Sequence, residues 1–172
     1  MLLAATGAIA QTGPASEYQL KAVFLLNFGR FVAWPPTVFP TPTSPFIIGV
    51  LGTDPFGDAL DQAVRGETIE GHPLAVRRHR RVSEAADCHI LFIGGSEAGH
   101  VDDIVAALAG RPVLTVCDAD GAAWHDVMIH FRTENRRIRL QINLAAAKAA
   151  DLTISSKLLR PAEIVTLAED RR

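Results

Sequence analysis

Two glycine-containing turns hold the residues whose types and spacing could bind a ligand. Each turn follows an apolar segment and precedes a predicted helix. In α/β proteins this is where phosphate groups bind, because the first N–H groups of a helix can donate to an anion. Neither turn has the G-x-G-x-x-G or G-K-[ST] spacing of a nucleotide site, and glycine also simply permits a tight reversal of the chain. A ligand cleft and two tight turns therefore remain as alternatives. The candidate ligand-cleft residues at these turns are Gly49, Gly52, Gly94, Gly95 and Ser96.

The side chains that commonly hold metal ions or act as nucleophiles form no recognisable motif. The 6 histidines have neither H-x-H nor H-E-x-x-H spacing, which leaves open only a zinc site assembled from distant residues. Asp118-Ala119-Asp120-Gly121 resembles part of a calcium loop, but the later ligands are missing, so we predict a turn there. No serine lies in G-x-S-x-G. We therefore expect no catalytic residue, no metal site and no cofactor.

The densest run of charge is Arg77-Arg78-His79-Arg80-Arg81, at the end of a predicted strand. There it forms either a solvated edge, which discourages edge-to-edge pairing of sheets, or a surface for an acidic partner. Exposed apolar residues could add binding energy at an interface of this kind, although core packing is the usual explanation for them. The candidate partner-binding residues are Phe31, Trp34, Arg77, Arg78, Arg80, Arg81, Leu158 and Leu159.

The two cysteines test the predicted topology. Cys88 begins one predicted strand and Cys117 ends another. If the two strands are parallel neighbours, the cysteines lie at opposite ends of the sheet, about 15 Å apart for about five residues of strand. A disulfide requires Cα atoms within about 7 Å. We therefore expect both thiols to be unpaired.

A long helix near the N-terminus is the first element that must position these residues. Ser16 and Gln19 form a capping-box pattern at its start, and Pro35 and Pro36 stop it. The positions at helical spacing are almost all apolar, which predicts a wide buried face. Asn27 is the polar exception and a further ligand-cleft candidate, with a satisfied buried amide as the alternative. The stripe consists of Leu20, Val23, Phe24, Asn27, Phe28 and Phe31.

The rest of the chain alternates apolar with helical segments, which is typical of a parallel sheet covered by helices. We predict helices that begin at Asp54 and Ser96, an Asn143-capped helix through Ala150, and a last helix over 162–168. The predicted fold is α/β: an open, mostly parallel, Rossmann-like sheet of about six strands with helices on both faces, ending in an antiparallel hairpin and C-terminal helices. The predicted strands are 46–51, 74–79, 89–93, 112–117, 127–132 and 137–141.

The composition fits one soluble globular domain. The chain has 172 residues, of which 48% are hydrophobic and 21% charged. Its net charge of −2 provides no strong attraction to nucleic acid or anionic lipid, and no apolar segment is long enough to insert into a membrane. We assign residues 16–172 to one α/β domain. Residues 1–15 are the remnant of a signal peptide, on the small-x-small pattern of Ala8-Ile9-Ala10, or a disordered N-terminus.

Several segments together resemble the YfiR family, over about residues 17–165. The opening signature covers residues 18–28 with Phe31 and Trp34-Pro35. The second joins Gly49-Val50-Leu51-Gly52 to Asp54-Pro55-Phe56-Gly57. The remaining matches are residues 88–93, 111–116, 138–143, Leu152 and 155–159.

This resemblance implies a periplasmic protein that represses an inner-membrane diguanylate cyclase by binding its periplasmic sensor domain, lowering cyclic-di-GMP and biofilm formation. It also implies a homodimer without catalytic residues. Family members with more cysteines use disulfides as a redox-sensitive element, and His130 stands where related chains commonly have Asn. The alternative function is a periplasmic small-molecule-binding module that reports to another membrane signalling protein.

Overall fold

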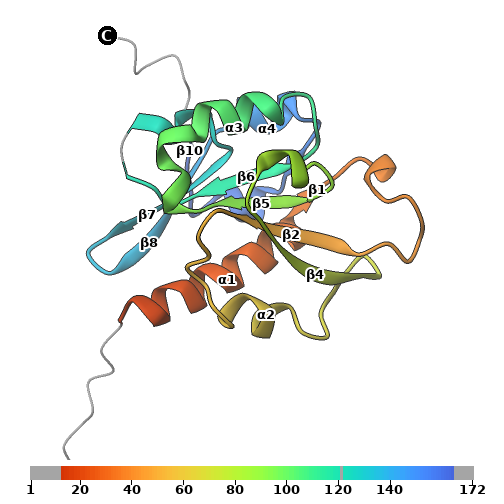
Figure 1. The fold of residues 1–172 in the computed structure, drawn as a ribbon, viewed down its shortest axis with the longest axis horizontal. Coiled ribbons are helices and arrows are strands. Elements are labelled where there is room, and N and C mark those ends of the chain that lie inside the picture. Colours follow the sequence, from red (N-terminus) through yellow and green to blue (C-terminus); the bar gives the residue numbers. More distant parts are fainter. Residues whose placement is uncertain (1–12, 121, 165–172) are drawn as a thin grey trace, which may run out of the picture.

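The centre of the molecule is a twisted sheet of eight strands, in the order β10-β8-β7-β6-β5-β2-β4-β3 (Figure 1). The computed structural model describes residues 13–120 and 122–164. All six predicted strands are present, and the mostly parallel α/β prediction is confirmed. The sheet strands are β2 (Phe46–Leu51), β3 (Thr68–Ile69), β4 (His72–His79), β5 (Ile90–Ile93), β6 (Leu114–Cys117), β7 (Ile129–Glu134), β8 (Arg137–Ile142) and β10 (Glu163–Ile164).

The strand order places β2 at a reversal point of the sheet. Strand β2 pairs in parallel with β4 on one side and with β5 on the other, and β5, β6 and β7 continue in parallel. This is the flavodoxin-like order of doubly wound proteins. Every residue of β2 is buried, as expected for a strand covered on both faces. Strands β1 (Val32–Ala33) and β9 (Thr153–Ile154) form a separate antiparallel ribbon.

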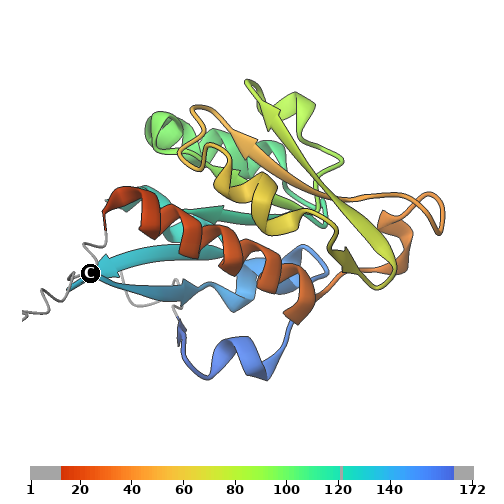
Figure 2. The same ribbon diagram turned by 90° about the horizontal axis from the view of Figure 1, so that it is seen from below.

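Helices cover both faces of the sheet, as Figures 1 and 2 show. Helices α1 and α2 lie side by side on one face, and α3 lies on the opposite face, where it packs on a second apolar cluster. The helices are α1 (Pro14–Phe31), α2 (Ala59–Val64), α3 (Val101–Ala107), α4 (Leu144–Ala149) and α5 (Ser156–Leu159). Short 3₁₀ helices are η1 (Pro36–Val38), η2 (Val82–Glu84), η3 (Gly95–His100) and η4 (Ala122–Asp126).

Helix α1 differs from the prediction at its start and in its buried face. It begins at Pro14, and the Ser16 hydroxyl donates to the Gly13 carbonyl oxygen instead of capping the helix. Leu20 and Val23 are 49% and 46% exposed, so the predicted stripe was wrong at these positions. The buried face carries small residues that let the helix approach the sheet. Its members are Lys21, Ala22, Leu25, Leu26, Phe28 and Gly29.

Two other helices begin later than predicted, because their expected caps are used in turns. Asp54 accepts a hydrogen bond from the backbone N–H of Phe56 at 2.7 Å, and α2 begins only at Ala59. Ser96 accepts from the backbone N–H of Thr53 at 2.9 Å, and α3 follows the η3 segment.

The C-terminal third contains one confirmed cap, one confirmed hairpin and one wrong helix. Asn143 accepts from the N–H of Ala146 at 3.0 Å and so caps α4 as predicted. Strands β7 and β8 are joined by Asn135 and Arg136, both with the positive φ that a two-residue hairpin turn requires. Residues 163–164 of the predicted last helix form strand β10, which pairs with β8, and residues 165–168 lie outside the described part.

The cysteines lie on neighbouring parallel strands, at opposite ends as predicted. Cys117 is the last residue of β6, where it is level with Ile93, whereas Cys88 precedes β5. Both are buried, unpaired thiols, and burial raises the pKa of each to about 12.

Candidate interaction surface and ligand sites

One arginine of the predicted basic run, Arg78, makes several contacts within the molecule. Arg78 donates to the Asp54 and Asp61 carboxylates and to the Gly57 carbonyl oxygen, which ties β4 to α2. The hydrogen bonds with Asp61 and Asp54 raise the pKa of Arg78 further above its usual value, and the Arg78 contact lowers the pKa of Asp61. Arg78 therefore has a clear structural role.

The other arginines of the run are more exposed. Arg77 donates to Asp87 at 2.7 Å. The Glu84 carboxylate accepts from the backbone N–H groups of Arg80 and Arg81, and these bonds lower the pKa of Glu84. The Arg81 guanidinium also lies 3.6 Å from Glu84 Oε1, but its side chain is 79% exposed. Arg80 and Arg81 are therefore the members of the run that could meet an acidic partner.

The predicted apolar contact residues lie largely in the core. Trp34 is half-buried, donates to the His89 carbonyl oxygen at 3.2 Å and packs edge-on against Phe46. Phe31 ends α1, where its carbonyl oxygen accepts from the N–H of Ser155 at 2.8 Å. Leu158 is buried in α5, and Phe31 and Leu159 are half-buried against the same core. The structure thus brings Phe31 beside the segment that leads into α5, with packing as the main role of this group.

An exposed apolar patch that the sequence pattern assigned to the core lies on α1. Leu20 and Val23 are the two large hydrophobic side chains that are exposed in the described part of the chain. Leu20 also lines a cavity of about 230 Å³ with Ile138 and Arg136 of the β7–β8 hairpin. We call Leu20, Val23 and this cavity the α1–hairpin groove. The sequence pattern alone could not reveal this groove, because it does not show which face of α1 packs against the sheet.

The two predicted ligand-cleft turns pack directly against each other. The Gly94 N–H donates to the Leu51 carbonyl oxygen at 2.9 Å, and an added Cβ at Gly94 would lie 2.7 Å from the Thr53 carbonyl oxygen. Gly52 has a φ of +84° and lies directly against Ser96. Glycine is needed here for close contact between the turns, and the chain itself fills the space between these residues.

The other ligand-cleft candidates are dispersed. Gly49 lies in the middle of β2, where an added Cβ would be 2.6 Å from the Cys88 sulfur. Asn27 is half-buried on α1. Gly95 is exposed and is the one member of the predicted set that lines the polar cavity described next.

A polar cavity of about 420 Å³ lies beyond the carboxyl ends of β5 and β6, a usual location for ligands in α/β folds. Its walls include Gly95 after β5, Asp118 after β6 and the first turns of α1. Lys21 is only 2% exposed, with its Nζ 2.8 Å from Asp118 Oδ2 and 2.7 Å from Glu17 Oε1. We call this space the Lys21 cavity.

The polar groups of the Lys21 cavity form a connected network. The Tyr18 hydroxyl donates to Asp118 at 2.7 Å, and burial together with this contact raises the pKa of Tyr18 well above its usual value. The hydrogen bond from Lys21 lowers the pKa of Glu17, which also accepts from Thr133. The i, i+4 spacing of Glu17 and Lys21 signals their pairing in sequence, but nothing in sequence signals Asp118 as the partner.

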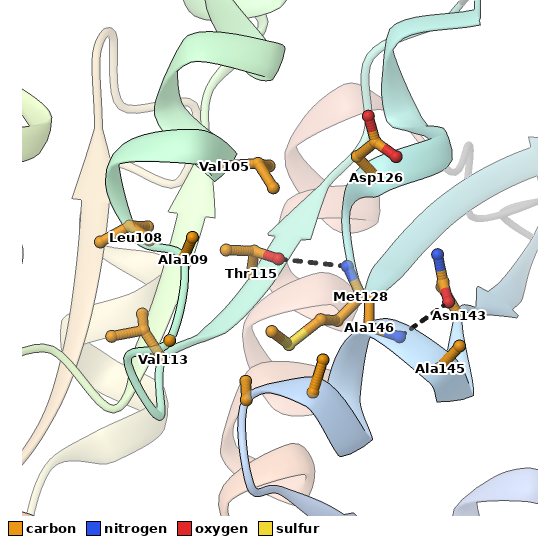
Figure 3. Close-up of a pocket in the computed structure, with 13 residues that line it drawn as sticks. Val105, Leu108, Ala109, Val113, Thr115, Asp126, Met128, Asn143, Ala145 and Ala146 are labelled. Atoms are coloured by element: carbon orange, nitrogen blue, oxygen red, sulfur yellow. Dashed lines mark hydrogen bonds between the residues drawn. The ribbon is translucent and has the colours of Figure 1, made fainter.

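A third cavity, of about 390 Å³, lies between α3 and α4 (Figure 3). Leu108 and Val113 line one side, and alanines of α4 line the other. Two of its polar groups have partners, because Thr115 accepts from the Met128 N–H and Asn143 caps α4, and Asp126 lies exposed at its edge. This cavity is mainly apolar, and we assign it no ligand.

Two further observations concern metal ions and membranes. Within residues 13–120 and 122–164, no group of three or more His, Cys, Asp or Glu side chains is placed to hold a metal ion. In the same part of the chain, no helix combines the length and apolar character needed to cross a membrane.

Comparison with known proteins identifies the family. A search of curated proteins finds no match to this chain. The sequence profile of the YfiR/HmsC-like family matches residues 18–163, from the first turns of α1 to the start of β10. This range includes all six predicted strands and most residues of the Lys21 cavity and the α1–hairpin groove, whereas Ser16 and Glu17 precede it. The chain therefore belongs to the YfiR/HmsC-like family.

Proposed function

We propose that this protein is a non-catalytic periplasmic regulator that binds the periplasmic sensor domain of an inner-membrane diguanylate cyclase and represses it. Repression lowers cyclic-di-GMP and biofilm formation. The observation that carries the proposal is the family match over residues 18–163, because members of this family are regulators and not catalysts. We also propose that the working form is a homodimer, which light scattering of the purified protein would test.

The α1–hairpin groove supports binding of a protein partner. Exposed large hydrophobic side chains that lie beside polar groups are typical of interaction sites. Here Leu20 lines a cavity together with Arg136, and the exposed Val23 follows it three residues later on α1. Repression by binding requires the regulator to bind the inactive sensor conformation more tightly than the active one. To shift the ratio of inactive to active sensor from 1:99 to 99:1, the regulator needs about 5.5 kcal/mol of difference in binding free energy between the two conformations.

Cyclic-di-GMP measurement in a deletion strain tests this function. Deletion should raise cyclic-di-GMP, and an exported copy should restore the low level whereas a copy kept in the cytoplasm should not. Exported Leu20→Ser/Val23→Ser should restore it poorly, because the groove loses its apolar contacts. Ala106→Ser, at an exposed position on α3, is the matched control and should restore it fully. Unchanged cyclic-di-GMP after deletion would contradict the proposal.

The Lys21 cavity favours a second function, a small-molecule-binding module that reports to a membrane signalling protein. A polar cavity of about 420 Å³ beyond the carboxyl ends of two parallel strands has the size and place of a ligand site. Thermal stabilisation of the protein by one compound from a metabolite collection, lost in Thr133→Val, would favour this function. A deletion phenotype without any stabilising compound would favour direct repression.

A further inference from the structure

Strand β8 is open to solvent along one side for most of its length. Strand β10 pairs with it only at Gln141 and Ile142. Residues 137–140 therefore have β7 on one side and no described strand on the other. This open stretch forms the turn end of the β7–β8 hairpin, at the left of Figure 1. An edge of this kind is a place where an extended segment of another chain can add a strand.

The register of the hairpin shows which backbone groups of this edge point outward. Glu134 and Arg137 flank the two-residue turn, and residues in that position exchange both backbone hydrogen bonds. Bonded and non-bonded pairs alternate along an antiparallel ladder, so the N–H and C=O groups of Ile138 point away from β7. No described residue bonds to either group. Ile138 therefore offers one donor and one acceptor to an added strand.

One face of the open edge is strongly basic. The hairpin carries four arginines and one carboxylate, that of Glu134, although the net charge of the chain is −2. Arg139 lies directly opposite Arg132, and Arg137 opposite Glu134 puts all four side chains on the same face of the sheet. The Glu134 carboxylate contacts Arg132 and Arg139. No carboxylate in the described part of the chain contacts Arg136 or Arg137, so this face suits an acidic partner.

The other face of the same edge is apolar and belongs to the α1–hairpin groove. Phe131 of β7 stacks on Phe28 of α1, with ring centroids at 5.6 Å. Because side chains alternate between the faces of a sheet, Ile138 lies on this side too, and it lines the groove with Leu20. A strand added to β8 would thus have one row of side chains on the basic face and the other row on the side of the groove.

We propose that an extended segment of a partner protein, with alternating acidic and apolar residues, adds to the open edge of β8. Its backbone bonds to Ile138, its carboxylates face Arg137 and Arg139, and its apolar side chains lie beside the groove. The proposal rests on the proposed regulatory function, because it describes the part of the sensor domain that this protein binds.

A second copy of the same edge does not fit this surface. Two antiparallel registers use the outward groups of Ile138. Pairing Ile138 with Ile138 of the copy brings Arg137 opposite Arg139, and pairing it with Leu140 brings Arg139 opposite Arg139. Like charges directly opposite each other destabilise a strand pair, whereas opposite charges stabilise it. The occupant is therefore an acidic segment and not another hairpin of this chain.

Hydrogen exchange of the full protein with a synthetic peptide tests strand addition directly. The probe is a capped seven-residue peptide in which glutamate alternates with valine. The N–H of Ile138 should exchange fast in the free protein, whereas those of Arg137 and Arg139, which bond to β7, should exchange slowly. Peptide at ten times its Kd should slow exchange at Ile138 about tenfold. Unchanged exchange at Ile138 with the peptide bound would overturn the proposal.

A modified peptide separates backbone pairing from attraction between charges. N-methyl groups on its three central residues keep the charge but remove the N–H donors and block pairing. This peptide should bind at least tenfold more weakly and leave Ile138 unprotected. Equal binding of the two peptides would overturn strand addition.

Charge reversal tests the acidic character of the segment. Arg137→Glu/Arg139→Glu, at two exposed positions, should raise the Kd of the glutamate peptide at least tenfold. The same peptide with lysine in place of glutamate should bind this variant more tightly than it binds the unmodified protein. Arg65→Glu/Arg111→Glu makes the same change of charge at exposed arginines elsewhere and is the matched control, with a Kd within about twofold of the original. Equal weakening in both double variants would overturn the site.

The deletion strain distinguishes this proposal from the regulatory function itself. An exported Arg137→Glu/Arg139→Glu copy should restore low cyclic-di-GMP poorly, and the Arg65→Glu/Arg111→Glu copy should restore it fully. Full restoration by both copies would overturn the edge as the partner site and leave the regulatory function standing. Unchanged cyclic-di-GMP after deletion would contradict the regulatory function instead, and protection of Ile138 by the peptide would still support an acidic strand at this edge.

Discussion

Lys21 and Asp118 are 97 positions apart in sequence, yet their charged groups meet at 2.8 Å with almost no exposure to solvent. The contact fastens α1 to the turn after β6. A buried ion pair adds little stability compared with a well-packed apolar pair. Removing one partner is nevertheless strongly destabilising, because the other charge is left buried and unpaired. The pair therefore fixes where α1 sits on the sheet, and thereby which of its side chains remain exposed.

Lys21→Met should destabilise the protein by about 3–5 kcal/mol, because Glu17 and Asp118 would then face each other without a cation. Urea unfolding at pH 7 measures this change. The exposed Lys157→Met is the control and should change stability by less than about 0.5 kcal/mol. A double variant, Lys21→Met/Asp118→Asn, should recover part of the loss. Equal stability of Lys21→Met and the unmodified protein would contradict the buried ion pair between Lys21 and Asp118.

Gly49→Ala should destabilise the protein by about 1–3 kcal/mol through overpacking. The added Cβ would lie 2.6 Å from the Cys88 sulfur and 3.0 Å from Leu91 Cδ1, both within the core. Combining it with Cys88→Ala should reduce the cost, because the sulfur is removed. Urea unfolding of the two single variants and the double variant gives the coupling energy.

The control for the glycine experiment is Gly99→Ala, since no heavy atom lies within 4 Å of an added Cβ there. It should be neutral or slightly stabilising. If the effects of Gly49→Ala and Cys88→Ala simply add, the two positions are not in contact.

The two thiols should be protected in the folded protein and reactive after unfolding. Burial raises the pKa of Cys88 and Cys117 to about 12, which keeps both as poorly nucleophilic thiols at pH 7.5. Iodoacetamide without reductant should therefore modify neither cysteine in buffer and both in urea, as read by mass spectrometry. A monomer that shows no free thiol in urea would contradict the parallel arrangement of β5 and β6.

The sequence predicts the six main strands because each is an apolar segment between turn residues, and it predicts the Asn143 cap from a local pattern. It misses β3 and β10, since two-residue edge strands have no periodicity. It also places Leu20 in the core, because apolar spacing cannot distinguish two neighbouring faces of α1. The buried face is chosen by long-range contacts, among them the one between Lys21 and Asp118.

Burial of the His89 ring should make the protein less stable as the solution becomes acidic. The pKa of His89 is lowered from 6.5 to about 4, mainly by burial, with His72 and Asp87 acting in opposite directions. Between these values the unfolded chain binds a proton that the folded protein does not. The favourable contribution is therefore complete above about pH 6.5 and is lost as pH falls towards 4, at up to about 1.4 kcal/mol per pH unit.

Urea unfolding of the unmodified protein and of His89→Asn at pH 7, 6 and 5 isolates this contribution, because other titrating groups affect both proteins alike. The difference in unfolding free energy between them should shrink as pH falls. Ala106→Ser should show no such trend, since it lies at an exposed position and removes no titrating group. Parallel pH profiles for the unmodified protein and His89→Asn would mean that the His89 ring takes up a proton as readily as in the unfolded chain. Its Nε2 would then be in contact with water and not buried.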